Sequence, residues 1–470
     1  MDNINENLVL MVIVIGTLMA SIDSTIVLLA FPAITAALHS NISTIIWIIL
    51  IYIIVVAVFS TQFGRIGDIY GRARMFNLGF VIFIISSFLC GIAPNDILLI
   101  AFRGIQAVGG ALLSSNSGAI IADTFDRNRM GKAYGFTAMS WNIGALLGIL
   151  LGGFITTFVG YRYIFFINVP IGIIALALSL RYIKDKARVR ERVDLLGMGT
   201  LGVAIAAISY SGINYASVGF NSLNGFMMLL GVSFAIIFIC VDRKAKAPTI
   251  NFSMFSNKIF RNSITASFFQ GLGFMGVVFL LIMYLQGIRG MNPLNASLVL
   301  LPGYVVSSVL SPIMGRYSDR LGSRTLTTLG MLFMIAGVSF YVLFLGVSSP
   351  IYYVVIGTIV TGIGGAMFWP ANSSAVMSNV KGELRGLASG TLRLFGSMGL
   401  IGSFVIAFVA ASASVPRSIA FEIFVGTSKV IGGIGGSFVN GMHLAFIVLI
   451  SMLVVAFILS FAKGNDARRS

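Results

Sequence analysis

The chain has 470 residues, of which 57% are hydrophobic and only 10% are charged, and its mean hydropathy is +0.99. Soluble domains carry about 25% charged residues, so this composition excludes an ordinary soluble domain and points to the lipid bilayer. The formal net charge of +16 could suggest nucleic acid as a partner, but the distribution of the basic residues excludes that interpretation.

Apolar blocks of about 17 to 25 residues recur along the chain, and this is the length that crosses about 30 Å of hydrocarbon. The first block follows Asp2 and Glu6 and is too long for a signal-peptide core, so we expect it to be a membrane span. The blocks predict fourteen transmembrane helices, near residues 8–31, 44–63, 75–93, 97–122, 134–158, 162–181, 195–214, 225–241, 262–285, 296–314, 325–346, 351–377, 387–411 and 442–462.

The Lys and Arg residues alternate between the two sides of these spans. If the N-terminus lies inside, all but six of the 31 fall in inner segments. The exceptions are Arg162, Arg289, Arg417 and Lys429 outside, and Arg103 and Arg393 within spans. This asymmetry follows the positive-inside rule. It predicts a multi-pass protein of the cell membrane with both termini in the cytoplasm, and it explains the positive charge without nucleic acid.

A repeat relates the two halves of the chain. The segment GRIGDIYG at Gly64–Gly71 returns as GRYSDRLG at Gly315–Gly322, and both share G-R-x-x-D-x-x-G. The Gly-Gly-Ala at Gly109–Ala111 returns at Gly364–Ala366. The similar offsets predict two six-helix halves, residues 1–182 and 251–470, with an inserted pair of transmembrane helices in residues 183–250.

Several catalytic and cofactor sites have no counterpart in this sequence. It contains no G-x-x-x-x-G-K-[ST] loop for ATP, no H-E-x-x-H and no paired carboxylates within the spans. The two histidines, His39 and His443, are too isolated to bind a metal, and Cys90 and Cys240 lie a membrane thickness apart. We therefore expect a protein that is not an enzyme and that has no metal, cofactor or disulfide.

The motifs resemble those of the major facilitator superfamily, in its fourteen-span drug:proton antiporter branch. GRIGDIYGRAR resembles the family's cytoplasmic signature, and residues 21–27 with Pro32 resemble the branch's first-helix motif. Residues 103–109 (RGIQAVG) and 161–172 (YRYIFFINVPIG) resemble its fourth-helix and sixth-helix motifs. The resemblance covers nearly the whole chain. It implies two six-helix bundles that rock around a central cavity, two accessory helices, and multidrug efflux coupled to protons.

One motif departs from the pattern of that branch. In the fifth helix Gly144, Gly148, Gly152 and Gly153 are present, but Ile149 occupies the motif's proline position. Glycines at i, i+4 and i+8 form a smooth stripe for close helix packing. A proline would remove one backbone hydrogen bond of the helix and bend it, and isoleucine does neither. A carrier with different coupling therefore stays an alternative.

Asp23 is the only carboxylate well within a predicted span, where an acid costs about 2.5–3.5 kcal/mol on insertion scales. We expect it to hold a proton or a cation, the alternative being a structural acid bonded to a neighbouring helix. Arg103 lies at a comparable depth in the same half, which makes it the expected partner of Asp23. The alternative for Arg103 is a side chain that reaches outward to water.

The repeated signature predicts a latch that holds the inner gate closed. Gly71 permits a tight turn, and Asp68 can face a helix N-terminus or an arginine across the interface of the halves. Topogenic charge alone explains the arginines but not the repeat of the aspartate. The predicted latch residues are Gly64, Arg65, Asp68, Gly71, Arg72 and Asp319, with Arg393 as a candidate partner.

Six further polar or aromatic residues lie within spans, and each could line the cavity or join two helices: Asn116, Asn142, Gln270, Tyr284, Trp369 and Asn372. The leading hypothesis is proton-coupled export of lipophilic small molecules, cations included, by a monomer embedded in the lipid bilayer. The alternative is an uncoupled or differently coupled carrier of a metabolite or lipid. A channel fits less well, because two halves with a gate signature each favour alternating access.

Overall fold

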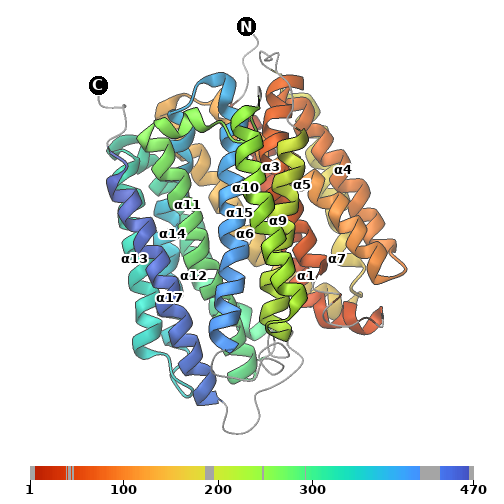
Figure 1. Ribbon diagram of the computed structural model, residues 1–470, viewed down its shortest axis with the longest axis vertical. Helices are drawn as coiled ribbons and strands as arrows, with labels where there is room; N and C mark the ends of the chain where they lie inside the picture. Colours follow the sequence, from red (N-terminus) through yellow and green to blue (C-terminus); the bar gives the residue numbers. More distant parts are fainter. Residues whose placement is uncertain are drawn as a thin grey trace.

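The structure is a computed structural model that describes residues 6–38, 40, 44, 47–185, 195–245, 248–291, 293–412 and 435–464. Long helices make up nearly all of this part of the chain, and it contains no strand. The helices stand side by side as one bundle, as Figure 1 shows.

The first half contains α1 (Glu6–Ala37), α3 (Trp47–Tyr70), α4 (Arg72–Ile92), α5 (Asp96–Thr124), α6 (Met130–Phe158), α7 (Tyr163–Phe166) and α8 (Asn168–Tyr182). The helices α9 (Leu195–Val218) and α10 (Ser222–Lys244) follow. The second half contains α11 (Lys258–Met283), the π-helical turn η3 (Tyr284–Ile288), α12 (Pro293–Leu321), α13 (Ser323–Phe344), α14 (Tyr352–Ser378), α15 (Arg385–Ser412) and α17 (Gly435–Ala462).

The expected span pattern agrees with these helices. Thirteen helical segments of the described chain are long and apolar enough to cross a membrane, with α7 and α8 together forming one of them. The remaining expected span is α9, a 24-residue helix that contains the shorter apolar segment Leu196–Gly212. The all-α membrane architecture predicted from hydropathy is therefore confirmed.

Each half is held together by its own helix pairs, and several pairs join the halves, most extensively α3 with α15 and α6 with α12. In the first half α1 packs on α6, and α5 packs on α3 and α4. In the second half α14 packs on α12 and α13, and α15 packs on α11. Across the halves α3 packs on α15 and α6 packs on α12, so each junction uses a helix that carries or faces the repeated signature.

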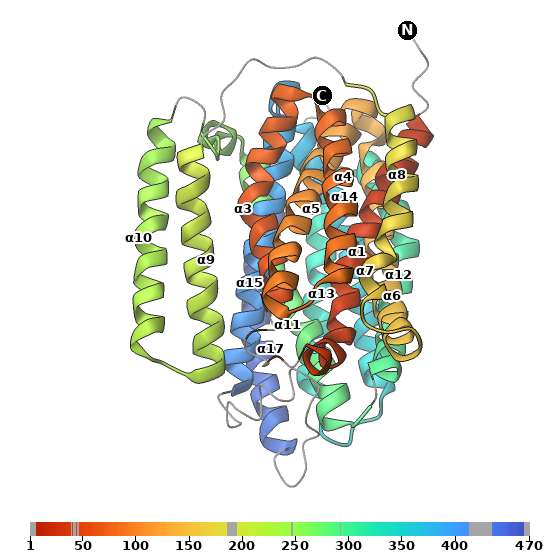
Figure 2. The same ribbon diagram turned by 90° about the vertical axis from the view of Figure 1, so that its right-hand side faces the viewer.

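The inserted helices lie at one side of this bundle. Figure 2 shows α9 and α10 as a pair beside α3 and α15. They pack on each other, and α9 contacts both α3 and α15. The pair therefore covers one of the two junctions between the halves. The residue limits of the three parts, 182/183 and 250/251, stay a prediction.

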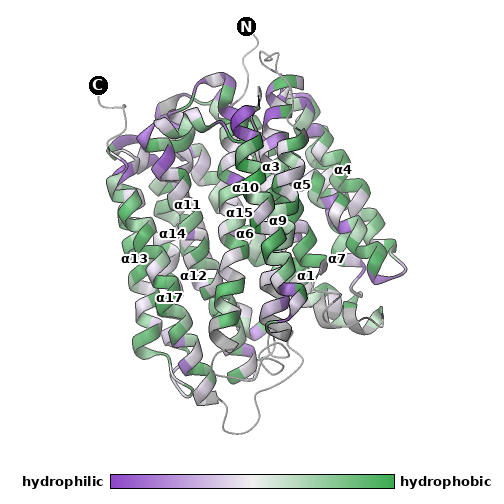
Figure 3. Cartoon of the chain, in the orientation of Figure 1, coloured by the Kyte–Doolittle hydropathy of each residue, from purple (hydrophilic) through white to green (hydrophobic). Residues whose placement is uncertain are grey.

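Both ends of the described chain lie at the same end of the bundle. There α1 begins and α17 ends, and Figure 3 shows hydrophilic residues concentrated at this end. We call it the basic end, because helix ends and turns that carry Arg72, Arg129, Arg320 and Arg385 lie there. The expected external hairpin at residues 412–441 falls largely outside the described residues.

The expected cytoplasmic location of the basic end can be tested by labelling. Single cysteines at both termini and in residues 183–194 are expected to react with an impermeant maleimide only after the membrane is opened, because the basic segments stay inside. Cysteines in residues 412–441 are expected to react in intact cells. Labelling of residues 183–194 from outside would overturn this topology.

The glycine stripe of α6 packs directly against α1 around Asp23. A Cβ atom added to Gly144 would lie 2.7 Å from the carbonyl oxygen of Leu18, and one added to Gly152 would lie 2.7 Å from that of Ile26. The adjacent Gly153 is half-buried. Only helices without side chains at the contact approach this closely, so the stripe sets the position of the α1 segment that carries Asp23.

The Gly148→Leu variant is expected to lose stability, because a Cβ at this position would lie 2.1 Å from Thr25 Oγ1 and 2.7 Å from the Ile22 carbonyl oxygen. Overpacking of this kind costs about 1–3 kcal/mol or more. The measurement is the melting temperature of the purified protein. Gly199→Leu is the matched control, since no atom lies within 4 Å of its added Cβ. Equal melting temperatures for both variants would contradict the tight α1–α6 contact.

Candidate functional site

Asp23 sits at the centre of a buried polar cluster. Arg103 Nη1 donates to Asp23 Oδ2 at 2.6 Å. The other carboxylate oxygen accepts from Gln106 Nε2 and from Asn168 Nδ2, both at 2.9 Å. The partners come from α5 and α8, so three helices of the first half meet at one carboxylate. The predicted pairing of Asp23 with Arg103 is present in the structure.

The guanidinium of Arg103 has several further partners. Its Nε donates to the carbonyl oxygen of Ile48 at 3.2 Å, and its Nη1 also donates to Gln106 Oε1 at 2.6 Å. The ring of Tyr52 lies 4.7 Å from the guanidinium carbon, which is a cation–π distance. Arg103 therefore does not reach outward to water.

The cluster is closed to solvent. The side chains of Asp23 and Arg103 are 0% and 2% exposed, and Gln106 and Asn168 are fully buried. An ion pair in such surroundings is stable only when hydrogen bonds satisfy its remaining atoms. Gln106 and Asn168 supply them. Sequence reasoning missed both, although Gln106 stands three residues after Arg103 and therefore on the same helix face.

A second polar cluster joins the halves at the basic end. Asp68, near the end of α3, accepts from the backbone N–H groups of Gly386 and Leu387, each at 3.2 Å. These are the second and third residues of α15, so the carboxylate binds a helix N-terminus of the opposite half. Arg72 Nε also donates to Asp68 at 2.8 Å. Asp68 thus faces a helix N-terminus across the interface of the halves, as expected, whereas its role as a gate latch stays a prediction.

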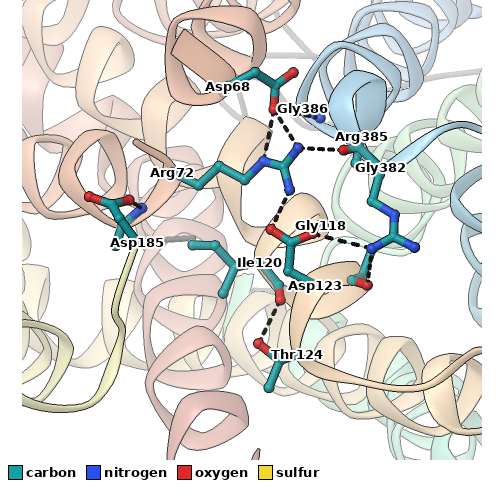
Figure 4. Close-up of polar contacts among 12 residues, drawn as sticks. Asp68, Arg72, Gly118, Ile120, Asp123, Thr124, Asp185, Gly382, Arg385 and Gly386 are labelled. Atoms are coloured by element: carbon teal, nitrogen blue, oxygen red, sulfur yellow. Dashed lines mark hydrogen bonds and ion pairs between the residues drawn. The ribbon is translucent and has the colours of Figure 1, made fainter. Parts of the chain in front are cut away.

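Two charged residues outside the signature extend this latch, as Figure 4 shows. Asp123, near the end of α5, forms ion pairs with Arg72 and with Arg385, the latter at 3.2 Å. Arg72 also donates to the carbonyl oxygen of Gly382 at 2.9 Å. Because Gly382 and Arg385 belong to the second half, several charge-assisted bonds cross the junction. Sequence analysis missed Asp123 and Arg385, whose only signal is a charge at a helix end.

The repeat of the signature makes a matching contact at the other junction. Asp319, near the end of α12, accepts from the backbone N–H groups of Gly131 at 2.9 Å and Lys132 at 3.0 Å. Both residues lie in the first turn of α6. Each half therefore places its aspartate on a helix N-terminus of the other half. Ser323 stands in the second copy where Arg72 stands in the first.

The glycines of the signature allow the two junctions to close. A Cβ at Gly64 would lie 2.1 Å from the carbonyl oxygen of Gly386, and one at Gly315 would lie 2.1 Å from that of Gly131. Gly71 has a φ of 111°, as the expected tight turn requires. The α3–α15 and α6–α12 backbones thus touch at the basic end in the same way.

Two predicted latch residues lie elsewhere. Arg65 donates to the carbonyl oxygen of Pro248 at 2.8 Å, so it binds the segment that leads from α10 to α11. Arg393 was a candidate partner of the latch, but the structure places it elsewhere. Its guanidinium carbon lies 5.0 Å from the centre of the Trp141 ring on α6. Arg393 is two turns along α15 from Arg385, too deep in the bundle to reach Asp68.

The six candidate cavity residues divide into two groups. Asn116, Gln270, Tyr284 and Asn372 are buried and contact neighbouring helices or loops of their own half. They therefore join structural elements in this conformation, and a role in lining the cavity stays a prediction for them. Asn142 and Trp369 are partly exposed. Asn142 Nδ2 donates to Ser307 Oγ at 2.9 Å and so connects α6 of one half to α12 of the other.

The comparisons with known proteins agree with this arrangement. Residues 13–405 match the family model of the Major Facilitator Superfamily. The riboflavin transporter RibZ of Clostridioides difficile is 31% identical over 387 residues, which cover 81% of this chain and 82% of that protein. Multidrug resistance protein 3 of Bacillus subtilis is 30% identical over 394 residues, covering 82% and 76% of the two chains.

A solved structure shares the same fold. The proton:xylose symporter XylE aligns with a TM-score of 0.68 at 15% identity, and the alignment covers 96% of this chain and 94% of that one. The family match spans most of the chain, including α3 with Asp68, α12 with Asp319 and the cluster around Asp23. Several relatives are named for multidrug resistance. The chain therefore belongs to the major facilitator superfamily of transporters.

Proposed function

We propose that the chain exports lipophilic small molecules in exchange for protons, by alternating access. The observation that carries this proposal is the single acid of the membrane interior: among the described spans, only Asp23 lies far from both helix ends. It is paired with Arg103 and is fully buried. Protonation would neutralise Asp23 and loosen this pair, and a change in helix packing around α1 can follow.

The latch supplies the second part of the proposed mechanism. When the basic end is closed, Asp68 and Asp319 each bind a helix N-terminus of the opposite half. Opening must break both contacts together with the Asp123–Arg385 pair. Loosening of the Asp23–Arg103 pair changes the packing of the first half, and the latches decide which end opens. Two states that differ in these few contacts are what alternating access requires.

A carrier of a metabolite is the second candidate function. It is supported by the relative named as a riboflavin transporter and by Ile149 at the position of the antiporter proline. The two candidates differ in what drives the substrate uphill. Purified protein in liposomes, with a pH gradient imposed and a panel of dyes and riboflavin inside, separates them. Gradient-driven movement of dyes supports the export proposal, whereas riboflavin flux that ignores the pH gradient supports the alternative.

The same liposomes distinguish a carrier from a channel. Flux through a carrier saturates with substrate and shows counterflow, because each binding event needs one conformational cycle. Linear flux without counterflow would contradict alternating access.

A further inference from the structure

Arg393 is a second arginine within the membrane-spanning part of the chain, and unlike Arg103 it has no carboxylate partner in the part that the structure describes. It lies on α15, eight residues or about 12 Å from the start of that helix at Arg385. Its Nε atom is buried and makes no hydrogen bond. Its guanidinium faces the ring of Trp141, 5.0 Å from the ring centre.

An arginine in this position is costly. A charged side chain near the centre of a bilayer raises the free energy by about 2.5–3.5 kcal/mol or more, and such residues usually mark a substrate or ion pathway. Arg103 offsets this cost with Asp23 and Gln106. Among the described residues, the contact given for the Arg393 guanidinium is the face of one indole, which attracts a cation more weakly than a carboxylate does. Its donors are therefore available to a ligand.

The surroundings of Arg393 come from both halves of the transporter. Trp141 and Asn142 are neighbours on α6, which packs on α1 and α12. Arg393 is on α15, which packs on α3 and α11. All three side chains are partly exposed, although their helices lie within the bundle. Arg393 and Trp141 come from opposite halves and meet between them, and alternating access requires the substrate to bind between the halves.

We propose that Arg393 and Trp141 form a substrate subsite and that it takes a flat aromatic anion, such as an aryl carboxylate. Arg393 donates two hydrogen bonds to the anion, and Trp141 stacks on the aromatic ring of the substrate. This inference rests on the proposed export function and specifies its substrate class. It replaces the expectation of cationic substrates, because Asp23 is enclosed by its own partners and the accessible charge is positive.

The proposal has an electrical consequence. A proton that moves in and a monoanion that moves out both transfer charge in the same direction. Export of an anion is therefore expected to depend on the membrane potential as well as on the pH gradient, and more strongly than export of an uncharged molecule of the same shape.

Three anthracene probes of nearly equal shape test the proposal: 9-anthracenecarboxylate, its uncharged methyl ester and the cation 9-(aminomethyl)anthracene. Binding to the purified full chain is measured by calorimetry. Wild type is expected to prefer the anion. Arg393→Gln is expected to weaken anion binding about tenfold to a hundredfold, the range for charge-assisted bonds, and to leave the ester within about twofold. Trp141→Leu is expected to weaken all three probes.

Matched variants keep the test decisive. Arg261→Gln removes one positive charge at an exposed position and is expected to bind like wild type. Arg393→Lys keeps the charge but loses the planar fork, so it is expected to fall between wild type and Arg393→Gln. It also serves if Arg393→Gln does not fold. Anion binding by Arg393→Gln equal to wild type, or a wild-type preference for the cation, would overturn the subsite.

The two proposals can fail separately. Suppose that the pH gradient drives transport of the ester or the cation, but that wild type does not prefer the anion and Arg393→Gln binds it like wild type. The export function then stands and the subsite is refuted. If the anion binds through Arg393 but no pH gradient drives any probe, the subsite stands and proton-coupled export is refuted.

Discussion

The Asp23→Asn variant is expected to lose uphill transport completely, because no other acid of the described spans lies far from their ends. Gradient-driven accumulation should fall to the background of empty liposomes. The substitution also leaves Arg103 buried without its carboxylate, and breaking one side of a buried ion pair costs about 3–5 kcal/mol. The single variant therefore combines a loss of coupling with a loss of stability.

A double variant separates these two effects. Asp23→Asn with Arg103→Gln removes both charges, and buried pairs can often be replaced by neutral groups at little cost in stability. Its melting temperature is expected to lie closer to wild type than that of Asp23→Asn. It should still show counterflow of substrate, since alternating access needs only the gates and a bound substrate. Full uphill transport by the double variant would mean that another group or ion carries the coupling.

The Asp68→Asn variant is expected to slow transport severely without preventing folding or membrane insertion. The carboxylate accepts two backbone N–H groups of α15 and binds Arg72. A neutral amide loses the charge in all three contacts. A hydrogen bond to a charged group contributes about 1.5–3 kcal/mol to stability. A net loss of about 3 kcal/mol in the closed state would shift the equilibrium between the two gate states about 150-fold.

Spin labels at Tyr70 and Glu383 report this shift, since both positions are exposed at the basic end on opposite halves. In wild type we expect a short distance between the two labels, and in Asp68→Asn a longer mean distance with a broader distribution. Asp319→Asn should have a smaller effect, because its junction lacks the counterpart of Arg72. Asp126→Asn, an exposed acid at the same end, is the control and should match wild type. Wild-type rates and distances in both latch variants would refute the latch.

The relation between the two clusters follows from their position on the helices. The Asp23 cluster lies within the first half and contains no residue of the second. The latches consist of bonds between the halves. Protonation can therefore change the shape of one half without directly breaking the gate, and the gate responds through α1, α3 and α6. This division explains why removal of Asp23 should affect the driving force and removal of Asp68 the rate of exchange.

The sequence by itself determined the features that depend on local composition. Hydropathy predicted the spans, the basic residues predicted a shared side for both termini, and the repeat predicted Asp68 and Asp319 as equivalent. The pairing of Asp23 with Arg103 also followed from the sequence, because two opposite charges at the same depth of the bilayer have few other partners to pair with. Each of these inferences needs only the position of a residue along its helix.

Only the tertiary structure decided which side chains face each other. In a membrane bundle most helices are apolar all round, so the periodicity that shows the buried face of a soluble helix is absent. The rotation of a helix about its axis then cannot be derived from its sequence. For this reason Arg393 was a candidate partner of the latch although it faces Trp141. The helix contacts of Asn116, Gln270 and Asn372 could likewise not be derived from the sequence. The roles of Asp123 and Arg385 depend on contact between distant helix ends, which the packing of the two halves alone creates.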